Sequence, residues 1–234
     1  MDTPVFGAGS ESRMWVVIDL QTTGLVPPGA RVVEMAARVY GSDFAFTALV
    51  DPGLVFTPPD DINDITPELI RRSGSESFQM VMHRFSMWLQ LRRIHYKDVL
   101  GAGELPGVEL VAHNAFGFDM VFLKAEILHC FHEAAWNQFF KEHGIAAVVD
   151  SLALLRQAST LRFPGFEKLS QFSLGSLAQE YAPSYAPVIR RALPSVDALC
   201  AVLDSVSERS GGFGMFYESL VEDDYVRRTP SAFQ

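Results

Sequence analysis

Hydrophobic positions in the first part of the chain recur in the pattern of β-strands. The run at 15–18 is apolar and rich in β-branched residues, and Asp19 follows it, which predicts a buried strand that projects Asp19 near its end. The stretches at 32–40 and 44–50 predict two more strands, because short turn-forming sequences separate them. We expect these three segments to form an antiparallel meander.

Helical periodicity and capping residues mark the rest of the chain. Thr66 precedes a proline and an acid, and Ser77 precedes a long amphipathic run, so both are expected to begin helices. Three glycines between 96 and 107 predict a loop. The expected elements beyond it are a strand at 109–112, a helix that carries Asp119, a strand at 146–149 with a helix after it, and helices at 173–181 and 193–206. This order predicts an α/β fold, with a mixed sheet and helices on both faces.

The length and the composition agree with one globular domain. The chain has 234 residues, and 48% of them are hydrophobic, which is enough for a full core. We expect the domain at 14–208, after a flexible N-terminus at 1–13. The segment at 209–234 is rich in aromatic and acidic residues. It can either close the domain as a helix or serve as a docking segment for a partner protein.

Charge and cysteine content narrow the functional classes. With 19 Lys and Arg against 28 Asp and Glu, the formal net charge is −9, so nonspecific binding of nucleic acid is disfavoured and any such contact needs a local site. Cys130 and Cys200 are too few for a disulfide framework and have no metal-binding spacing. No apolar run reaches the roughly 18–20 residues that span a bilayer. We expect an intracellular protein without a membrane partner; nucleus, cytoplasm and organelle remain open.

Two aspartates occupy positions suited to metal binding. Asp19 ends a predicted buried strand, and Asp119 stands in the first turn of a helix that follows another strand. Both can face the carboxyl edge of one sheet, where sites of α/β proteins usually lie. Carboxylates in such a position can hold paired Mg²⁺ ions, which activate water and stabilise the leaving oxygen in phosphodiester cleavage. The ordinary structural alternative for each is a helix cap or a turn.

Five short motifs follow one another in an order known from one family. They are Asp19–Leu25, Val32–Glu34, Ile62–Leu69, Val111–Asn114 with Asp119, and Phe172–Leu177. Together they resemble the 3′–5′ exonucleases of the DEDDh group, above all the TREX-type three-prime repair exonucleases. The resemblance extends roughly over residues 16–204. It implies an RNase H-like exonuclease fold with a five-stranded mixed sheet flanked by helices.

The resemblance also implies which positions carry the site. The five catalytic positions of the family fall on Asp19, Gln21, Asp119, Arg190 and Ser195. The implied substrate-binding positions are Leu20, Thr22, Thr23, Gly24, Leu25, Asn114, Phe116 and Arg191. In the family, the acidic positions hold two Mg²⁺ or Mn²⁺ ions.

Three of the five catalytic positions depart from the family pattern. Gln21 stands where the family has glutamate, and the amide removes a full negative charge. Arg190 stands at the position of the histidine base, and a guanidinium stays protonated at physiological pH. Ser195 replaces the last aspartate and is neutral and short. Asp19 and Asp119 are then the remaining metal ligands, and their binding of Mg²⁺ is expected to be weak or lost.

These departures lead to a hypothesis and an alternative. The chain is expected to be an inactive pseudo-exonuclease, without a cofactor, that serves as a binding or scaffold subunit of a nucleic-acid-processing assembly with protein partners. The alternative is an active Mg²⁺- or Mn²⁺-dependent 3′–5′ exonuclease on single-stranded DNA or RNA, with a non-standard site. Arg190 and Arg191 could neutralise the aspartates or grip a phosphate, and Arg162 and Lys168 could help to hold a single strand.

Three further residues allow a functional and a structural interpretation. His113 is a candidate ligand but is better explained as a buried imidazole with hydrogen-bond partners. Phe116 could stack on a base or pack in the core. Asp197 could in principle replace the missing aspartate, but its position two residues farther along a helix turns its side chain about 200° away from that of Ser195.

Overall fold

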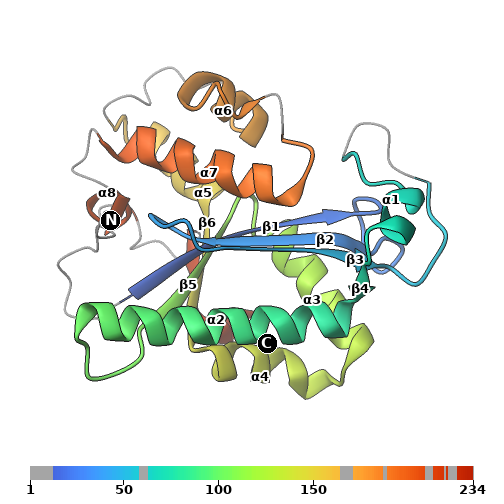
Figure 1. The fold of residues 1–234 in the computed structure, drawn as a ribbon. Coiled ribbons are helices and arrows are strands. Elements are labelled where there is room, and N and C mark those ends of the chain that lie inside the picture. Colours follow the sequence, from blue (N-terminus) through green and yellow to red (C-terminus); the bar gives the residue numbers. More distant parts are fainter. Residues whose placement is uncertain are drawn as a thin grey trace.

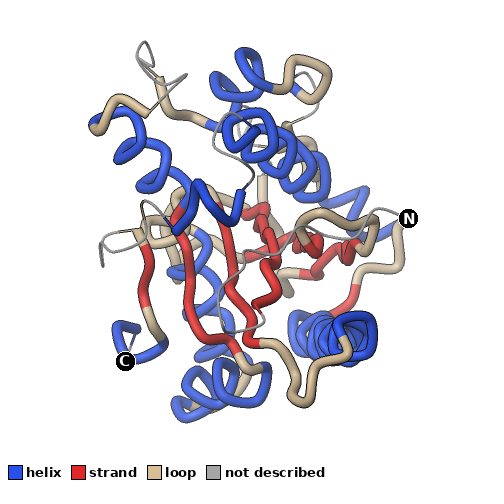
Figure 2. Tube along the Cα trace, turned by 90° about the vertical axis from the view of Figure 1, so that its left-hand side faces the viewer, coloured by secondary structure: helices blue, strands red, loops and turns tan. Residues whose placement is uncertain are grey.

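The computed structural model describes residues 13–57, 63–163, 171–186, 189–208, 213–218, 220 and 226–233. Residues 1–12, Ile62 and Lys168, which entered the sequence predictions, lie outside the described residues. The described residues form an α/β structure in which helices cover both faces of one sheet (Figures 1 and 2). The predicted fold class is therefore confirmed.

The sheet is mixed and has the strand order β4-β3-β2-β1-β5-β6-β7. Its strands are β1 (Arg13–Thr22), β2 (Val32–Val39), β3 (Ala45–Asp51), β4 (Glu76–Ser77), β5 (Gly107–Ala112), β6 (Ile145–Asp150) and β7 (Arg227–Arg228). The first three strands pair antiparallel, as the predicted meander requires. β5 joins β1 in parallel and β6 joins β5 in parallel, so β1 lies between the two halves of the sheet.

The expected number of strands was wrong. The described residues contain a sheet of 7 strands, whereas the resemblance implied five. The two additional strands, β4 and β7, have 2 residues each and lie at the two edges of the sheet. A segment of two residues has no hydrophobic alternation, so no sequence pattern could reveal it.

Alternation along β1 divides its side chains between two cores. Met14, Val16, Ile18 and Leu20 point to one face of the sheet and belong to one hydrophobic cluster. Trp15 and Val17 belong to the cluster on the other face. Successive side chains of a strand point to opposite faces, so Asp19 and Gln21 lie on the same face as Trp15 and Val17.

The helices divide in the same way. They are α1 (Pro67–Arg72), α2 (Phe78–Leu100), α3 (Asp119–Cys130), α4 (Glu133–His143), α5 (Ser151–Thr160), α6 (Leu174–Tyr181), α7 (Ala192–Ser207) and α8 (Phe213–Glu218). Buried residues of α2, α3 and α4 join the cluster of one face, and those of α5, α6, α7 and α8 join the cluster of the other (Figure 1). Among the described residues, no helix is both long and apolar enough to cross a membrane.

The predicted helix starts are confirmed, but one predicted loop began too early. The Thr66 hydroxyl accepts a hydrogen bond from the Leu69 amide (3.1 Å), and Ser77 caps α2. The expected loop at 96–107 is helical as far as Leu100, because Tyr96 is buried in the core and keeps the last turns in place. Gly101 then ends the helix with φ 61°, a left-handed conformation that glycine adopts without strain.

The C-terminal segment packs on the domain wherever it is described. Phe216, Tyr217 and Val226 are buried in the cluster that contains α7. β7 pairs with β6 at the edge of the sheet. Pro230–Phe233 form a 3₁₀ turn, and the carbonyl of Phe233 accepts hydrogen bonds from the Lys124 ammonium (2.7 Å) and the Trp136 indole (3.0 Å). These contacts attach the segment to both faces of the domain.

A buried glutamate holds β7 in place, which gives a stability prediction. The Glu109 side chain is 1% exposed and pairs with Arg227 at 2.9 Å, with Arg13 farther away at 3.8 Å. Removal of one partner of a buried ion pair typically costs about 3–5 kcal/mol. Because Arg13 can partly replace the lost charge, we expect Arg227→Ala to lower the free energy of unfolding by about 2–3 kcal/mol. Urea denaturation measures this change.

A surface ion pair provides the matched control. Arg72 pairs with Glu68 four residues earlier on α1, and both side chains are exposed. Such pairs contribute roughly 0–1 kcal/mol, so Arg72→Ala should have a much smaller effect. Equal losses for the two variants would show that Glu109 does not depend on Arg227.

Candidate functional site

The structure brings the two predicted aspartates together. Asp119 is the first residue of α3 and is 2% exposed, and its Oδ1 accepts a hydrogen bond from the Leu20 amide of β1 (3.1 Å). Asp19 lies on β1 beside that amide, and its Oδ2 accepts a hydrogen bond from the Gln21 Nε2 (2.7 Å). A strand end and a helix start thus place two carboxyl groups next to each other at one edge of the sheet.

Both carboxyl groups have raised pKa values. Burial raises the pKa of Asp19 from 3.8 to about 8, the amide of Gln21 opposes this shift, and the charge of Glu34 adds to it. Burial also raises the pKa of Asp119 well above its usual range, and the negative charge of Asp19 raises it further. The charged forms of these two carboxyl groups are therefore electrostatically unfavourable, because few neighbouring groups stabilise them.

The threonines at the end of β1 and just after it form hydrogen bonds within the turn that follows the strand. Thr22 is fully buried and donates a hydrogen bond to the carbonyl of Gly24 (2.5 Å), while the Thr23 hydroxyl accepts one from the Arg31 amide (2.9 Å). The side chain of Leu20 is buried in the core. Leu25, in contrast, is 65% exposed. Of the substrate-binding positions predicted in this segment, Leu25 thus offers the largest apolar surface to a ligand.

The two arginines of the predicted site take part in ion pairs. Arg190 binds the Asp64 carboxylate through its Nε at 2.6 Å, and both side chains are exposed. Arg191 binds Glu34, which is nearly inaccessible, with Nε at 3.0 Å and Nη2 at 2.5 Å. The Arg191 guanidinium is thereby held by a buried carboxylate of β2 and not by either aspartate of the pair.

Ser195 and Asp197 lie on α7, and the side chain of each one binds another group of the protein. Ser195 is 2% exposed, and its hydroxyl donates a hydrogen bond to the carbonyl of Arg191 one turn earlier (3.0 Å). The Asp197 carboxylate pairs with Arg38 of β2 at 2.8 Å. This pairing agrees with the expectation that Asp197 points elsewhere than Ser195.

The residues after β5 mainly contact other parts of the protein. His113 uses both ring nitrogens: Nε2 lies 2.8 Å from the Phe172 carbonyl and Nδ1 lies 3.1 Å from the Ser151 hydroxyl, and burial lowers its pKa. Asn114 is exposed and has a positive φ of 65°. The Phe116 ring lies below the Arg228 guanidinium, 4.2 Å from its centroid. The C-terminal segment therefore covers the ring that was a candidate for base stacking.

Two acids that position the site were assigned no functional role by the sequence predictions, although Glu34 belongs to one of the five motifs. Glu34 receives the Arg191 side chain and also the Ala192 amide at the start of α7 (2.7 Å). Asp150 caps α5 and accepts hydrogen bonds from the amides of Asn114 and Phe116, both at 3.1 Å. The signal for Asp150 was the same as for Asp19, an acid that follows a buried strand, and the signal for Glu34 was an acid inside an apolar run.

The donor set that the described residues provide does not fit a pair of divalent ions. Among the described residues, no three His, Cys, Asp or Glu side chains are grouped so that they could hold a metal. Asp19 and Asp119 supply two carboxyl groups, while Gln21 presents an N–H donor to Asp19. Divalent magnesium prefers several oxygen ligands and is bound through charge, so two carboxyl groups with an amide donor make a poor double site.

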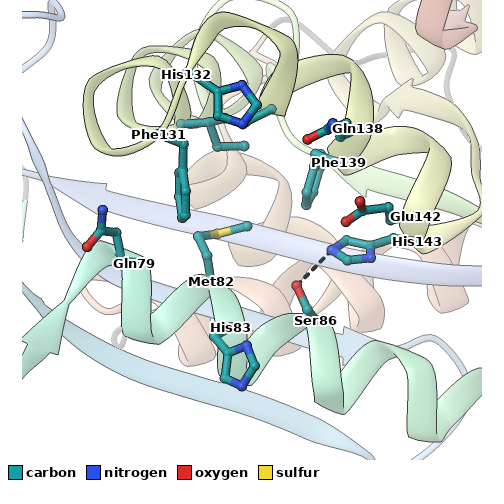
Figure 3. Close-up of a pocket in the computed structure, with 12 residues that line it drawn as sticks. Gln79, Met82, His83, Ser86, Phe131, His132, Gln138, Phe139, Glu142 and His143 are labelled. Atoms are coloured by element: carbon teal, nitrogen blue, oxygen red, sulfur yellow. Dashed lines mark hydrogen bonds between the residues drawn. The ribbon is translucent and has the colours of Figure 1, made fainter.

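Two hollows of the described surface lie outside the carboxyl pair. One, of about 290 Å³, is lined by Glu34, Arg191, Glu76 and Arg84, whose charges pair with one another. The other, of about 240 Å³, lies between α2 and α4, where the Ser86 hydroxyl and His143 Nε2 are 2.7 Å apart (Figure 3). Neither hollow contains Asp19 or Asp119 in its lining.

The fold and the position of the carboxyl pair define a class of protein. A mixed sheet with β1 between an antiparallel and a parallel half, with aspartates at the end of β1 and the start of α3, is the arrangement of the RNase H-like exonuclease fold that the motifs predicted.

Comparisons with known proteins agree with this class, although no family model matches the chain. The chain is 30% identical over 196 residues to the chloroplastic/mitochondrial exonuclease DPD1 of Arabidopsis thaliana; the match spans 82% of this chain and 55% of that protein. The chain thus spans about half the length of this curated relative.

Solved structures of E. coli exonuclease I share the fold. A zinc-bound complex with single-stranded DNA has a TM-score of 0.65 at 18% identity, over 89% of this chain and 43% of that one. A complex with a dA16 oligonucleotide has a TM-score of 0.65 at 19% identity, over 88% and 42%. The chain therefore has the fold of these structures and is similar in sequence to a plant exonuclease. The closer likeness to the TREX type stays a prediction.

Proposed function

We propose that this chain is a pseudo-exonuclease, which keeps the exonuclease fold but lacks metal-dependent hydrolysis, and that it works as a nucleic-acid-associated binding or scaffold subunit. The observation that carries the proposal is the composition of the site. Two carboxyl groups lie side by side, the described residues contain no group of three His, Cys, Asp or Glu side chains that could hold a metal ion, and a glutamine amide donates to one of the carboxyl groups.

The residues at the other catalytic positions support the same conclusion. The Ser195 hydroxyl is committed to a main-chain carbonyl inside α7 and has no charge to offer a cation. Arg190 carries a permanent positive charge and is paired with Asp64. General base catalysis needs a group that can accept a proton near neutral pH, and a guanidinium cannot do so.

The binding part of the proposal rests on the relatives and on exposure. The exonuclease I structures contain single-stranded DNA, and in this chain Leu25 and Asn114, two of the predicted substrate-binding positions, are exposed. Phosphate contacts would come from a few local arginines, since the net charge is −9. An intracellular location and protein partners belong to the same proposal; the name of the plant relative places that protein in chloroplasts and mitochondria.

An active enzyme is the second candidate, and one observation favours it. The plant relative is named an exonuclease, and the two aspartates lie together as they would in a working site. In this version, Asp19 and Asp119 bind Mg²⁺ or Mn²⁺ with ligands outside the described residues, and the substrate is single-stranded DNA or RNA.

Calorimetric titration with Mg²⁺ and with Mn²⁺ distinguishes the two functions. For the pseudo-exonuclease we expect no saturable heat at millimolar metal, and the same trace for Asp119→Asn, because two carboxyl groups do not retain the ions. Tight binding that is lost in Asp119→Asn would establish the enzyme instead.

Binding of a short labelled oligonucleotide at two salt concentrations tests whether the chain binds nucleic acid, because phosphate contacts must weaken as salt rises.

A further inference from the structure

The outer face of α2 carries an apolar stripe that the fold does not use. Its core face holds Phe78, Val81, Phe85 and Leu89, all buried. On the opposite side, the exposed side chains recur at alternating intervals of four and three residues, and they are Met80, Arg84, Met87, Leu91, Ile94 and Asp98. We call these six residues the outer stripe. Such spacing is that of the a and d positions of a coiled coil.

The apolar members of the outer stripe are unusually exposed for their size. Met87 and Leu91 are each 54% exposed, Met80 is 50% exposed and Ile94 is 44% exposed. Single exposed apolar residues are ordinary, but Met87, Leu91 and Ile94 follow one another along the helix and make a continuous apolar surface that suits a protein contact, with Met80 beyond Arg84. In both views α2 lies at the outside of the molecule, and no described element covers its outer side (Figures 1 and 2).

The length of α2 is sufficient for helix pairing. The helix has 23 residues, which at about 1.5 Å per residue gives roughly 34 Å. The outer stripe runs along most of this length. Two such helices side by side can alternate their stripe residues in successive layers, as knobs in holes.

The charges at the ends of the outer stripe indicate which occupant fits. Arg84 stands near its beginning and Asp98 at its end, with the apolar residues Met87, Leu91 and Ile94 between them. In a parallel pair of identical helices, each of these charges would face its own copy, and like charges repel. In an antiparallel pair in which Met87 faces Leu91 of the second copy, Arg84 faces Ile94, and Asp98 of the second copy lies four residues, about 6 Å, farther along the helix. The stripe is thus complementary to itself in the antiparallel direction.

We propose that α2 binds α2 of a second copy of this chain in an antiparallel pair along the outer stripe. The proposal is independent of the function of the carboxyl site. A two-fold axis brings the same surface from both copies together, which is the commonest symmetry of homodimers. Arg84 already pairs with Glu76 in its own chain, and its guanidinium has enough donors to serve a second carboxylate.

Sedimentation velocity of the full chain over a range of concentrations tests the proposal. We expect a monomer–dimer equilibrium, and Leu91→Glu should raise its dissociation constant at least about tenfold, because two buried carboxylates would face the apolar layers. The melting temperature of Leu91→Glu should stay close to that of the native chain, since Leu91 is already more than half exposed. Val121→Glu is the matched control, because Val121 is 43% exposed on α3 outside the stripe.

A charge exchange tests the direction of the pair. Asp98→Arg should weaken the dimer several-fold by placing arginine near Arg84 of the second copy, and the double variant Arg84→Asp with Asp98→Arg should restore it. A chain that stays monomeric at all concentrations, or a dimer that Leu91→Glu leaves intact, would overturn the proposal. A dimer that the double variant fails to restore would overturn the antiparallel arrangement.

Discussion

The triple variant Gln21→Glu, Arg190→His and Ser195→Asp is expected to degrade single-stranded DNA or RNA in the presence of Mg²⁺, whereas the native chain does not. Gln21→Glu replaces the amide donor beside Asp19 with a carboxylate, and Ser195→Asp adds a third acid in the first turn of α7, where a helix N-terminus favours negative charge. Arg190→His supplies a group that can accept a proton near neutral pH. General acid–base catalysis alone contributes roughly 10²–10⁴-fold, so a gain of at least about 10³-fold is expected.

Single and matched variants make this experiment decisive. Gln21→Glu by itself should stay inactive, because neither the base nor the last acid is present. Adding Asp119→Asn to the triple variant should abolish the recovered activity, because Asp119 is the acid that lies beside Asp19. Release of nucleotides from a labelled strand is the measurement. Native activity equal to that of the triple variant would refute the pseudo-exonuclease.

Asp119→Asn in the native chain is expected to stabilise the protein, and the gain should grow with pH. Burial and the neighbouring Asp19 raise the pKa of Asp119, and that of Asp19 is raised to about 8. Between roughly pH 4 and pH 8 the native state holds protons that the unfolded chain has released, so the free energy of unfolding falls as pH rises. Asparagine keeps an oxygen for the Leu20 amide but has no charge to bury. At pH 8 we expect a gain of about 1–3 kcal/mol.

Urea denaturation with EDTA at several pH values between 5 and 8 measures this effect. Asp43→Asn is the control, because Asp43 is an exposed side chain in a turn, away from the buried carboxyl pair. A gain for Asp119→Asn that is the same at every pH would mean that the buried charge is not its cause. A loss of stability at pH 8 would mean that the carboxylate is compensated by a group outside the described residues.

Much of the fold could be predicted because its main elements bury long apolar faces. The alternation that begins at Trp15 extends over β1 and fixes which of its side chains lie with Asp19 and Gln21. The caps at Thr66 and Ser77 are local signals, so they needed no knowledge of the tertiary structure. The edge strands and the last turns of α2 could not be predicted, because they depend on what packs against them.

The candidate site could be predicted only in part, for a similar reason. The proximity of Asp19 and Asp119 could be predicted, because Asp19 lies near the end of a strand and Asp119 begins a helix at the same edge of the sheet. The pairing of Arg191 with Glu34 joins residues 157 positions apart, and two charged residues at such a separation leave no pattern in the sequence. Sequence reasoning therefore offered a phosphate or the aspartates as partners of Arg191, whereas a buried glutamate of β2 holds its guanidinium.

The attachment of β7 has a consequence for synthesis of the protein in the cell. Glu109 lies in the middle of the sheet, and its partner Arg227 is 118 positions farther along the chain. Until that arginine leaves the ribosome, buried Glu109 lacks its nearer ion-pair partner and has Arg13 at 3.8 Å, and the strand edge at β6 is open. The growing chain should therefore be most vulnerable to aggregation, and most dependent on chaperones, just before its carboxyl-terminal residues emerge.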